Sequence, residues 1–179
     1  MEINKHEDFK DFADYLVLPE KATMVPQGSW ARGHEELATV GVATCVIIIA
    51  HNSLTGEGLV GHFSAISPES HSNPRLKNEN FDTESFKEAV SAIPTLGPPE
   101  RTQLWVGGGD VHGKDGQYYY EEVLLDRDFA LQTINEMVTV NGMPSDAVRI
   151  DWKNTGQDLF ISLDCHANTL LIQNLQEEF

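Results

Sequence analysis

The chain alternates short apolar runs with polar segments that contain glycine or proline, a pattern typical of a mixed α and β protein. Several runs are rich in Val, Ile, Leu or aromatic residues and are bounded by turn-forming residues, which predicts strands. These predicted strands cover residues 45–50, 58–64, 101–106, 118–125, 147–152, 159–164 and 169–173. The segment between the last two strands reads CHAN and is expected to form a turn.

Apolar residues also recur every three or four positions in other parts of the chain, which predicts amphipathic helices. These helices are expected over residues 6–17, 83–93 and 128–140, the second with Thr83 as its N-cap. Because strands and helices do not alternate strictly, we expect the α+β class, a layered sandwich with a mixed, largely antiparallel sheet packed by helices. We expect residues 1–179 to form one domain, with the first helix as an extension.

The most informative pattern is a β-hairpin formed by the strands at 45–50 and 58–64. If its turn is centred just before Leu54, Cys45 pairs with His62 across the two strands. Paired residues hold their Cβ atoms about 4.5 to 5.5 Å apart, close enough for a thiolate and an imidazolium to form an ion pair. A slip of one residue would place the two side chains on opposite faces, so the register is a specific prediction.

Cys45 stands at the head of an aliphatic run, where its sulfur can face a cleft while the following residues are buried. An imidazolium neighbour lowers the pKa of a thiol, and the base of such a pair is usually oriented by a third group. Thr39 is the candidate for that group. A straight strand would separate it from Cys45 by about 20 Å, so we expect a bend, which Gly41 is suited to provide.

Thr39, Cys45 and His62 follow the spacing T-x5-C-x16-H, which resembles the CheD family of chemoreceptor glutamine deamidases. The resemblance extends over roughly residues 37–173, with a helix, a strand ending in paired glycines, another helix and a terminal hairpin. The triad also resembles that of bacterial toxin deamidases. Two segments depart from the family: the chain reads Ala-Thr-Cys before the strand instead of Gly-Ser-Cys, and HFSAISP replaces the usual leucine and proline after the histidine.

The resemblance implies a cysteine hydrolase that deamidates a glutamine side chain of a protein substrate, without a cofactor or metal. Cys45 would be the nucleophile, His62 the acid and base, and Thr39 the group that orients His62. Candidates for the oxyanion donors and the cleft are Thr44, Ser64 and Asp110. A catalytically silent module with the same fold is one alternative, and a thiol peptidase or transglutaminase is another.

Charge narrows the classes of partner. The 12 Lys and Arg residues against 28 Asp and Glu residues give a net charge of −16, which repels nucleic acid and anionic lipid. We therefore expect no nucleic-acid partner and no membrane insertion, and a protein partner with a basic face. No apolar signal-peptide core is visible, which predicts a cytoplasmic protein, or a secreted effector without a cleavable signal peptide.

Single residue types admit simpler interpretations. Buried cysteine is common in protein cores, and Cys165 is expected to be incidental. Asp110 and His112 in the glycine-rich loop could join His62 around a metal, but isolated Asp and His in a turn are usually only polar loop residues. Only the combination of Thr39, Cys45 and His62 indicates a site.

Overall fold

The computed structural model describes residues 1–11, 22–69, 81–110, 120–152 and 158–176. Within these residues the strands form two five-stranded sheets. Sheet A has, in spatial order, the strands β1 (Glu2–Asp11), β10 (Thr169–Gln176), β9 (Leu159–Asp164), β4 (Glu36–Val42) and β2 (Thr23–Met24). Sheet B has, in spatial order, β3 (Ser29–Gly33), β6 (Glu57–Phe63), β5 (Val46–Asn52), β7 (Thr102–Gly108) and β8 (Val148–Trp152).

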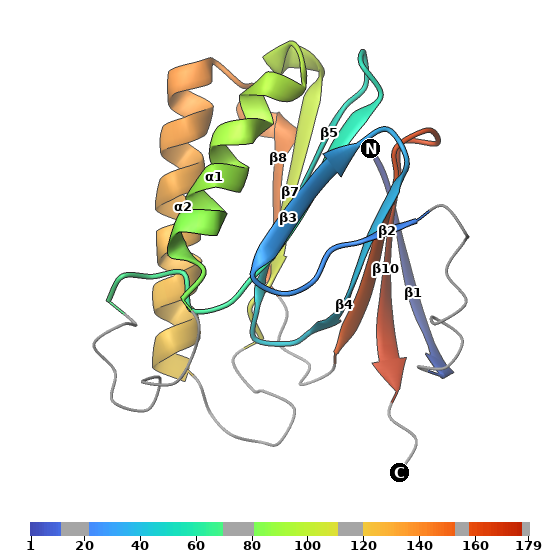
Figure 1. Cartoon of the computed structure of the whole chain (residues 1–179), viewed down its shortest axis with the longest axis vertical. Helices are drawn as coiled ribbons and strands as arrows, with labels where there is room; N and C mark the ends of the chain where they lie inside the picture. The colour runs from blue at the N-terminus through green and yellow to red at the C-terminus, as the bar shows by residue number, and fades with distance from the viewer. Residues whose placement is uncertain (12–21, 70–80, 111–119, 153–157, 177–179) are drawn as a thin grey trace.

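The two α-helices of the described residues are α1 (Thr83–Ala92) and α2 (Tyr120–Asn141). Short 3₁₀ turns at Ile93–Leu96, Pro99–Arg101 and Ser145–Ala147 connect helices to strands. Both α-helices cover one side of sheet B, and sheet A covers the other side, so the molecule has three layers (Figure 1). This arrangement confirms the predicted α+β layered sandwich, whose sheets contain both parallel and antiparallel pairs.

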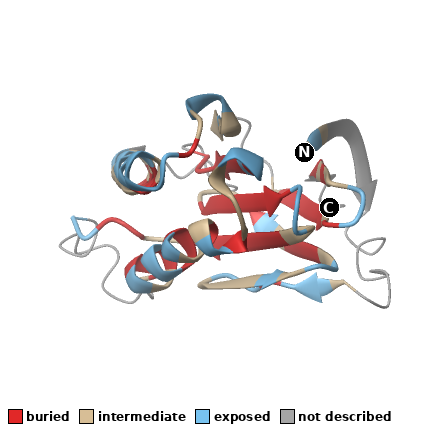
Figure 2. Ribbon diagram, turned by 90° about the horizontal axis from the view of Figure 1, so that it is seen from above, coloured by how far each residue is buried: buried red, intermediate tan, exposed pale blue. Residues whose placement is uncertain are grey.

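Strand β5 is central to the core because both of its faces are covered. Val46 and Ile48 pack in the cluster that includes the helices, whereas Ile47 and Ile49 pack in the cluster between the two sheets. All four side chains are fully buried. Figure 2 shows the same division, with buried central strands and exposed outer helix faces. Burial on both faces explains why this strand is a continuous aliphatic run rather than an alternating one.

The predicted β5–β6 hairpin is confirmed, but its predicted register is wrong by two residues. Ile47, and not Cys45, pairs with His62. A shift of two residues keeps every side chain on its predicted face, because the side-chain period of a strand is two. Cys45 thus lies in the bend just before β5, two residues before Ile47, and is not the partner of His62.

The turn explains this shift. Its centre lies between Leu54 and Thr55, because Asn52 pairs with Glu57 at the end of the hairpin. The side-chain oxygen of Asn52 accepts hydrogen bonds from the backbone N–H groups of Leu54 and Thr55 at 3.0 and 3.1 Å. Gly56 then takes a positive φ of 71°, which closes the loop. This side-chain-capped turn is one residue further along the chain than hydrophobic alternation alone predicts.

The predicted bend between Thr39 and Cys45 is confirmed at Gly41. Gly41 has a φ of 73°, a conformation that favours glycine. Val40 and Val42 pair with consecutive residues of β9, so Gly41 is the extra residue of a bulge. Beyond the bulge the chain leaves sheet A and enters sheet B, which connects the strand of Thr39 to the strand that follows Cys45.

The predicted N-terminal helix at residues 6–17 is wrong over residues 6–11, and residues 12–17 lie outside the described part of the chain. Residues 2–11 form β1, which pairs in parallel with β10 at the edge of sheet A. Hydrogen bonds to a neighbouring strand satisfy the backbone here, so tertiary pairing overrides the local helical spacing of apolar residues.

The predicted strand at 118–125 is also wrong where the structure describes it, because α2 begins at Tyr120. Residues 118 and 119 lie outside the described residues. The predicted helix at 128–140 is therefore the second part of a longer helix. The residues Val123, Ala130, Ile134 and Met137 are buried at helical spacing, a signal that the β propensity of the tyrosines concealed. The other predicted strands, the helix at 83–93 and the CHAN turn are confirmed.

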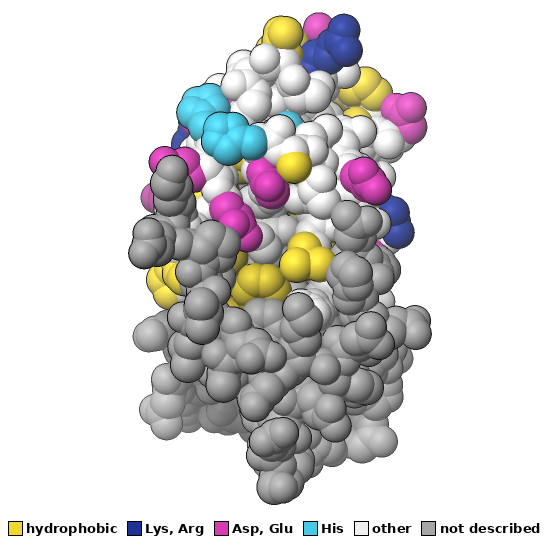
Figure 3. Space-filling view, turned by 90° about the vertical axis from the view of Figure 1, so that its right-hand side faces the viewer, with side chains coloured by type: hydrophobic (Ala, Val, Ile, Leu, Met, Phe, Trp, Pro, Cys, Tyr) yellow, Lys and Arg dark blue, Asp and Glu magenta, His cyan; other side chains and the backbone are white. Residues whose placement is uncertain are grey.

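The outer side of sheet A carries a small apolar cluster. Ala38 and Phe160 are buried there, and Val40 and Leu171 are half-buried. Figure 3 views this side of the molecule and shows hydrophobic side chains close to acidic ones. Among the described residues, neither α-helix is long and apolar enough to cross a membrane.

Candidate functional site

A hydrogen-bonded pair of side chains, Thr39 and His62, joins the two sheets. Thr39 lies on β4 and His62 on β6, and both side chains are buried. The Thr39 hydroxyl lies 2.7 Å from Nδ1 of His62 and donates a hydrogen bond of 2.8 Å to the carbonyl oxygen of Val25. Since a hydroxyl has one proton, it must accept the hydrogen bond from His62. Nδ1 of His62 therefore carries a proton.

This arrangement defines the other nitrogen of His62. In a neutral imidazole with a proton on Nδ1, Nε2 has a lone pair and acts as an acceptor. Nε2 is buried and has no hydrogen-bond partner among the described residues. A buried acceptor without a partner is rare in proteins, so this atom is a candidate for contact with a reacting group or a ligand.

Burial also determines the charge of His62. Desolvation lowers its pKa from 6.5 to about 4. Near neutral pH His62 is therefore neutral, and its role toward a thiol is that of a proton acceptor. The structure does not support the predicted ground-state ion pair with an imidazolium, because burial disfavours the charged ring.

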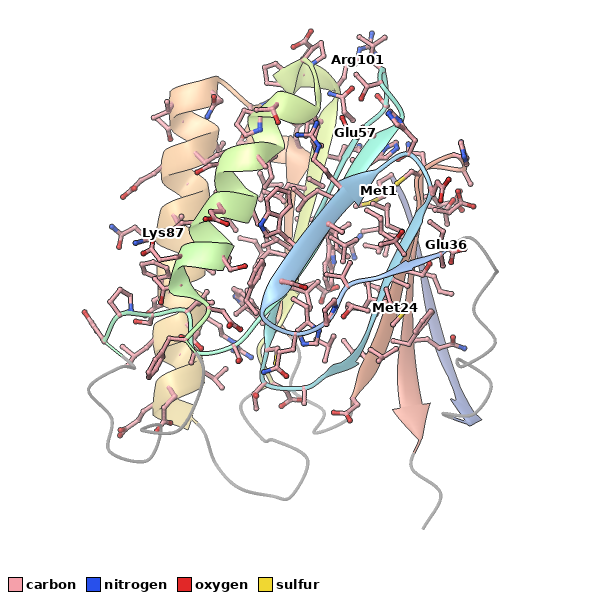
Figure 4. All side chains as sticks on the ribbon, in the orientation of Figure 1. Met1, Met24, Glu36, Glu57, Lys87 and Arg101 are labelled. Atoms are coloured by element: carbon pink, nitrogen blue, oxygen red, sulfur yellow. The ribbon has the colours of Figure 1, made fainter. Side chains whose placement is uncertain are left out.

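Cys45 lies at the same end of the hairpin as His62. It directly precedes β5, and its side chain is 6% exposed. The β5–β6 ladder ends at the pair of Val46 and Phe63, so Cys45 lies in the bend just beyond it, two residues before Ile47, the partner of His62. The opposite end of these strands is the turn, where Glu57 is labelled in Figure 4.

The backbone around Cys45 is attached to the end of β7. The N–H of Gly109 donates to the carbonyl oxygen of Cys45 at 2.7 Å, and the N–H of Asp110 donates to the carbonyl oxygen of Ala43 at 2.9 Å. The hydrogen bond to Ala43 places Asp110, a predicted cleft residue, beside the loop of Cys45, and Asp110 is fully buried there. Thr44 lies in the same bend and is half-buried.

An arginine of α2 supports this attachment. Nε of Arg127 donates to the carbonyl oxygen of Gly109 at 2.8 Å, and Nη2 donates to the same oxygen. The guanidinium group also lies 5.3 Å from the ring centre of Trp152, a cation–π distance. Arg127 thus fixes the loop that holds Cys45, a role that the sequence did not predict because helix spacing alone does not reveal a partner in a distant loop.

Ser64, another predicted cleft residue, already donates its hydrogen bonds to the buried carboxylate of Asp82. Its backbone N–H and its hydroxyl donate to Oδ2 of Asp82 at 2.7 and 3.3 Å, and Gln27 donates to the Ser64 hydroxyl at 2.8 Å. Burial raises the pKa of Asp82. Asp82, and not Thr83 as predicted, is the N-cap residue of α1, and it ties the helix to the end of β6. Ser64 is therefore a structural support rather than an available donor.

The described residues contain no group of three or more His, Cys, Asp or Glu side chains that could hold a metal ion. The alternative is a metal site formed by Asp110, His112 and His62. The structure describes Asp110 and His62, whereas His112 lies outside the described residues.

The second cysteine differs sharply from the first. Cys165 lies in the turn between β9 and β10, is 2% exposed, and its carbonyl oxygen accepts a hydrogen bond from His51 at 3.0 Å. Burial and the nearby carboxylate of Asp164 raise the pKa of the Cys165 thiol to about 12. Cys165 is therefore an inert thiol, which makes it an internal reference for the reactivity of Cys45.

Comparisons with known proteins give only distant likenesses. No protein-family model matches the chain, and no curated protein matches it. The hypothetical protein YfiH of Bacillus licheniformis has a TM-score of 0.40 and 10% identity over 70% of this chain and 50% of its own. Protein NMB0706 of Neisseria meningitidis, described by the family model DUF152, has a TM-score of 0.41 and 8% identity over 80% of this chain and 66% of its own.

The chain thus spans half of one of these proteins and just under two thirds of the other. Scores this low assign neither a family nor an activity, and neither protein is described as a deamidase. The CheD-like family and the deamidation that it implies therefore stay predictions from the sequence.

The hydroxyl of Thr39 can be tested with two matched variants. Thr39→Val keeps the shape but leaves Nδ1–H of His62 and the Val25 carbonyl without a partner, whereas Thr39→Ser keeps the hydroxyl. A buried polar group left unpaired costs about 1 to 3 kcal/mol. In urea unfolding we expect Thr39→Val to lose more free energy of unfolding than Thr39→Ser by about this amount. Equal losses would show that the hydroxyl does not bridge the sheets.

The buried His62 predicts a dependence of stability on pH. Between pH 6.5 and about 4 the unfolded chain binds a proton at this residue that the folded chain does not. The stability contributed by His62 is therefore complete above pH 6.5 and falls by about 3 kcal/mol as the pH drops toward 4. The free energy of unfolding of the natural chain, minus that of His62→Asn, should decrease over this range. A difference that does not vary with pH would contradict the burial of a neutral ring.

Proposed function

We propose that the protein is a cysteine-dependent hydrolase that converts glutamine side chains of a protein substrate to glutamate. The observation that carries the proposal is the tautomer of His62: Thr39 holds the proton on Nδ1, and Nε2 is left as a buried acceptor. The nucleophile candidate Cys45 lies at the same end of the hairpin. A thiol, a base and a group that orients the base are the elements of nucleophilic catalysis by cysteine.

In the first half of the reaction, His62 takes the thiol proton of Cys45 on Nε2. The thiolate attacks the carboxamide carbon of the substrate, and a sulfur–carbon bond forms. When the carbon–nitrogen bond breaks, the nitrogen takes the proton from Nε2 of His62 and leaves as ammonia. The product of this half is a thioester on Cys45, and His62 is neutral again.

In the second half, a water molecule attacks the thioester carbon and transfers a proton to Nε2 of His62. The sulfur–carbon bond breaks, glutamate is released, and the thiolate of Cys45 takes the proton back. The net reaction consumes one amide and one water and yields one carboxylic acid and one ammonia. A neutral histidine suits both halves, because each begins with removal of a proton by Nε2.

Thr39 is a positioning residue in this mechanism, since it acts through His62. The backbone N–H groups of Cys45 and Thr44 are the candidate donors to the oxyanion of the tetrahedral intermediate. The hydroxyl of Ser64 already donates to Asp82, and the N–H groups of Gly109 and Asp110 already donate to the backbone of the nucleophile loop. These three groups therefore support the site instead of serving the oxyanion.

The substrate in this proposal is a protein that presents an accessible glutamine. The net charge of −16 favours a basic face on that partner. We include in the proposal that the chain acts as one CheD-like domain without a cofactor, in the cytoplasm or as a secreted effector without a cleavable signal peptide.

Thiol alkylation measures the central step of this proposal. In the native protein Cys45 should react at least tenfold faster than Cys165 near neutral pH, because on this proposal His62 takes the proton of Cys45, while burial raises the pKa of Cys165 to about 12. The His62→Asn variant should slow alkylation of Cys45 and leave Cys165 unchanged. Peptide mapping by mass spectrometry resolves the two sites. Similar rates at both cysteines would contradict the role of Cys45 as the nucleophile and would favour the alternative of a catalytically silent module.

Glutamine-containing peptides then distinguish the reactions of a reactive thiol. Deamidation hydrolyses the glutamine carboxamide to a carboxylic acid, so the peptide gains a glutamate. The Cys45→Ala variant must not form this product. A peptide coupled to an added primary amine would indicate a transglutaminase, and a cleaved backbone would indicate a peptidase. Either product without glutamate would contradict the deamidase proposal.

A further inference from the structure

Strand β8 forms one edge of sheet B. It pairs in parallel with β7, and within the described residues no strand pairs with its other side. The edge of a strand presents N–H and C=O groups that can pair with a further strand, so proteins usually cover such an edge or protect it with charges. The residues of β8 therefore indicate whether this edge is protected from a partner strand or suited to one.

Ile150, at the centre of β8, is an exposed apolar residue of this edge. Its neighbours Val148 and Trp152 pack against the cluster on the helix side of sheet B, whereas Ile150 is 45% exposed. Among the strands of this sheet α2 packs mainly against β5, closer to the middle of the sheet. The helix thus leaves the centre of the edge strand uncovered.

One flank of α2 adds apolar residues on the same side of the sheet. Leu124 and Leu131 are half-buried, and Arg127 lies one helical turn from each of them. The guanidinium group of Arg127 contacts the ring of Trp152 on β8, so this flank of the helix faces the edge strand. Apolar residues that gather beside an open strand edge are typical of an interaction surface.

The backbone of Ile150 points away from β7. The carbonyl oxygen of Asp151 lies 2.9 Å from the position that a Cβ atom on Gly107 of β7 would take, so the backbone of Asp151 faces β7. Alternate residues of a strand direct their N–H and C=O groups to the same neighbouring strand. The N–H and C=O groups of Ile150 therefore face the open edge, where a strand of another molecule can pair with them.

The charges of β8 are complementary to a second copy of the same strand, whose sequence is VRIDW. If two copies pair antiparallel with Ile150 on a two-fold axis, Arg149 of each copy stands opposite Asp151 of the other. Both charged residues lie on the face of Trp105 and Gly107, their partners on β7. Opposite charges directly across two strands stabilise the pair, and like charges destabilise it. Protecting charges of one sign would repel a second copy instead.

The remaining charges of the chain are compatible with this contact. A carboxylate has about four acceptor positions, so Asp151 can bind Arg149 of a second copy beside its interaction within its own chain. The net charge of −16 opposes unspecific association of two chains. At physiological ionic strength, however, charges more than about 8 Å apart are largely screened, whereas paired side chains across two strands lie closer than this.

We propose that β8 is a homodimer interface, in which two copies pair antiparallel about Ile150 and join their five-stranded sheets B into one continuous sheet. Because β8 runs parallel to β7, Trp152 lies at the same end of the sheet as the loop of Cys45. The antiparallel copies therefore place their two Cys45 loops at opposite ends. The interface is independent of the deamidase proposal.

Sedimentation velocity of the full chain measures the association. A strand pair is a small interface, so we expect the mass to rise from that of one chain, 19.9 kDa, toward twice this value between about 1 and about 500 μM. Arg149→Asp and Asp151→Arg each place like charges across the interface and should each raise the Kd by at least about tenfold. Lys87→Glu makes the same change of charge as Arg149→Asp, but on α1, and should leave the Kd unchanged.

Two rescues identify the register. An equimolar mixture of the Arg149→Asp and Asp151→Arg chains again places opposite charges at both positions, and so does the double variant paired with itself. Both should associate as the natural chain does. Hydrogen exchange of the natural chain adds a test without substitutions: the amide of Ile150 should exchange more slowly at high concentration, whereas that of Asp151, which faces β7, should not depend on concentration.

Each result decides for or against the interface. A natural chain that stays monomeric at about 500 μM overturns it, and so does an Ile150 amide that is equally protected at every concentration, because the chain itself would then cover the edge. Association that persists in both single variants, or that neither rescue restores in folded protein, also overturns it. None of these results depends on the reactivity of Cys45.

Discussion

The hydrogen bond between Thr39 and His62 is the interaction on which the rest of the site depends. It crosses from sheet A to sheet B, and both partners are buried, so it is protected from competition by water. The Thr39 hydroxyl donates its proton to the Val25 carbonyl, so toward His62 it can only accept, and Nδ1 of the imidazole carries the ring proton. Burial then keeps the ring neutral. One hydroxyl thereby specifies both the orientation and the charge state of the candidate base.

The surrounding fold supports this arrangement from several directions. The bulge at Gly41 lets one chain segment pass from the strand of Thr39 to the loop of Cys45. Gly109 and Asp110, just after β7, hold that loop, and Arg127 of α2 binds the carbonyl oxygen of Gly109. Asp82 ties the start of α1 to the end of β6. Polar contacts thus gather at one end of a sandwich whose middle is aliphatic.

The sequence predicted the features that depend on local pattern, and missed those that depend on distant partners. The aliphatic run after Cys45 predicted β5, and glycine chemistry predicted the bend. The register was wrong by two residues because the side chain of Asn52 caps the turn, a contact that alternation does not reveal. The helical spacing that continues from Val123 was concealed in the first turns of α2 by the β propensity of the tyrosines. The roles of Asp82 and Arg127 depend on tertiary contacts, which no spacing in the sequence indicates.

The direct test of the account is the protonation of His62 in the folded protein, measured by the nitrogen chemical shifts of its ring at pH 7. We expect a proton on Nδ1 and none on Nε2, a state that persists as the pH is lowered until the ring titrates near pH 4. A proton on Nε2, or a ring that is already doubly protonated at pH 7, would contradict the assignment of His62 as a buried neutral base oriented by Thr39.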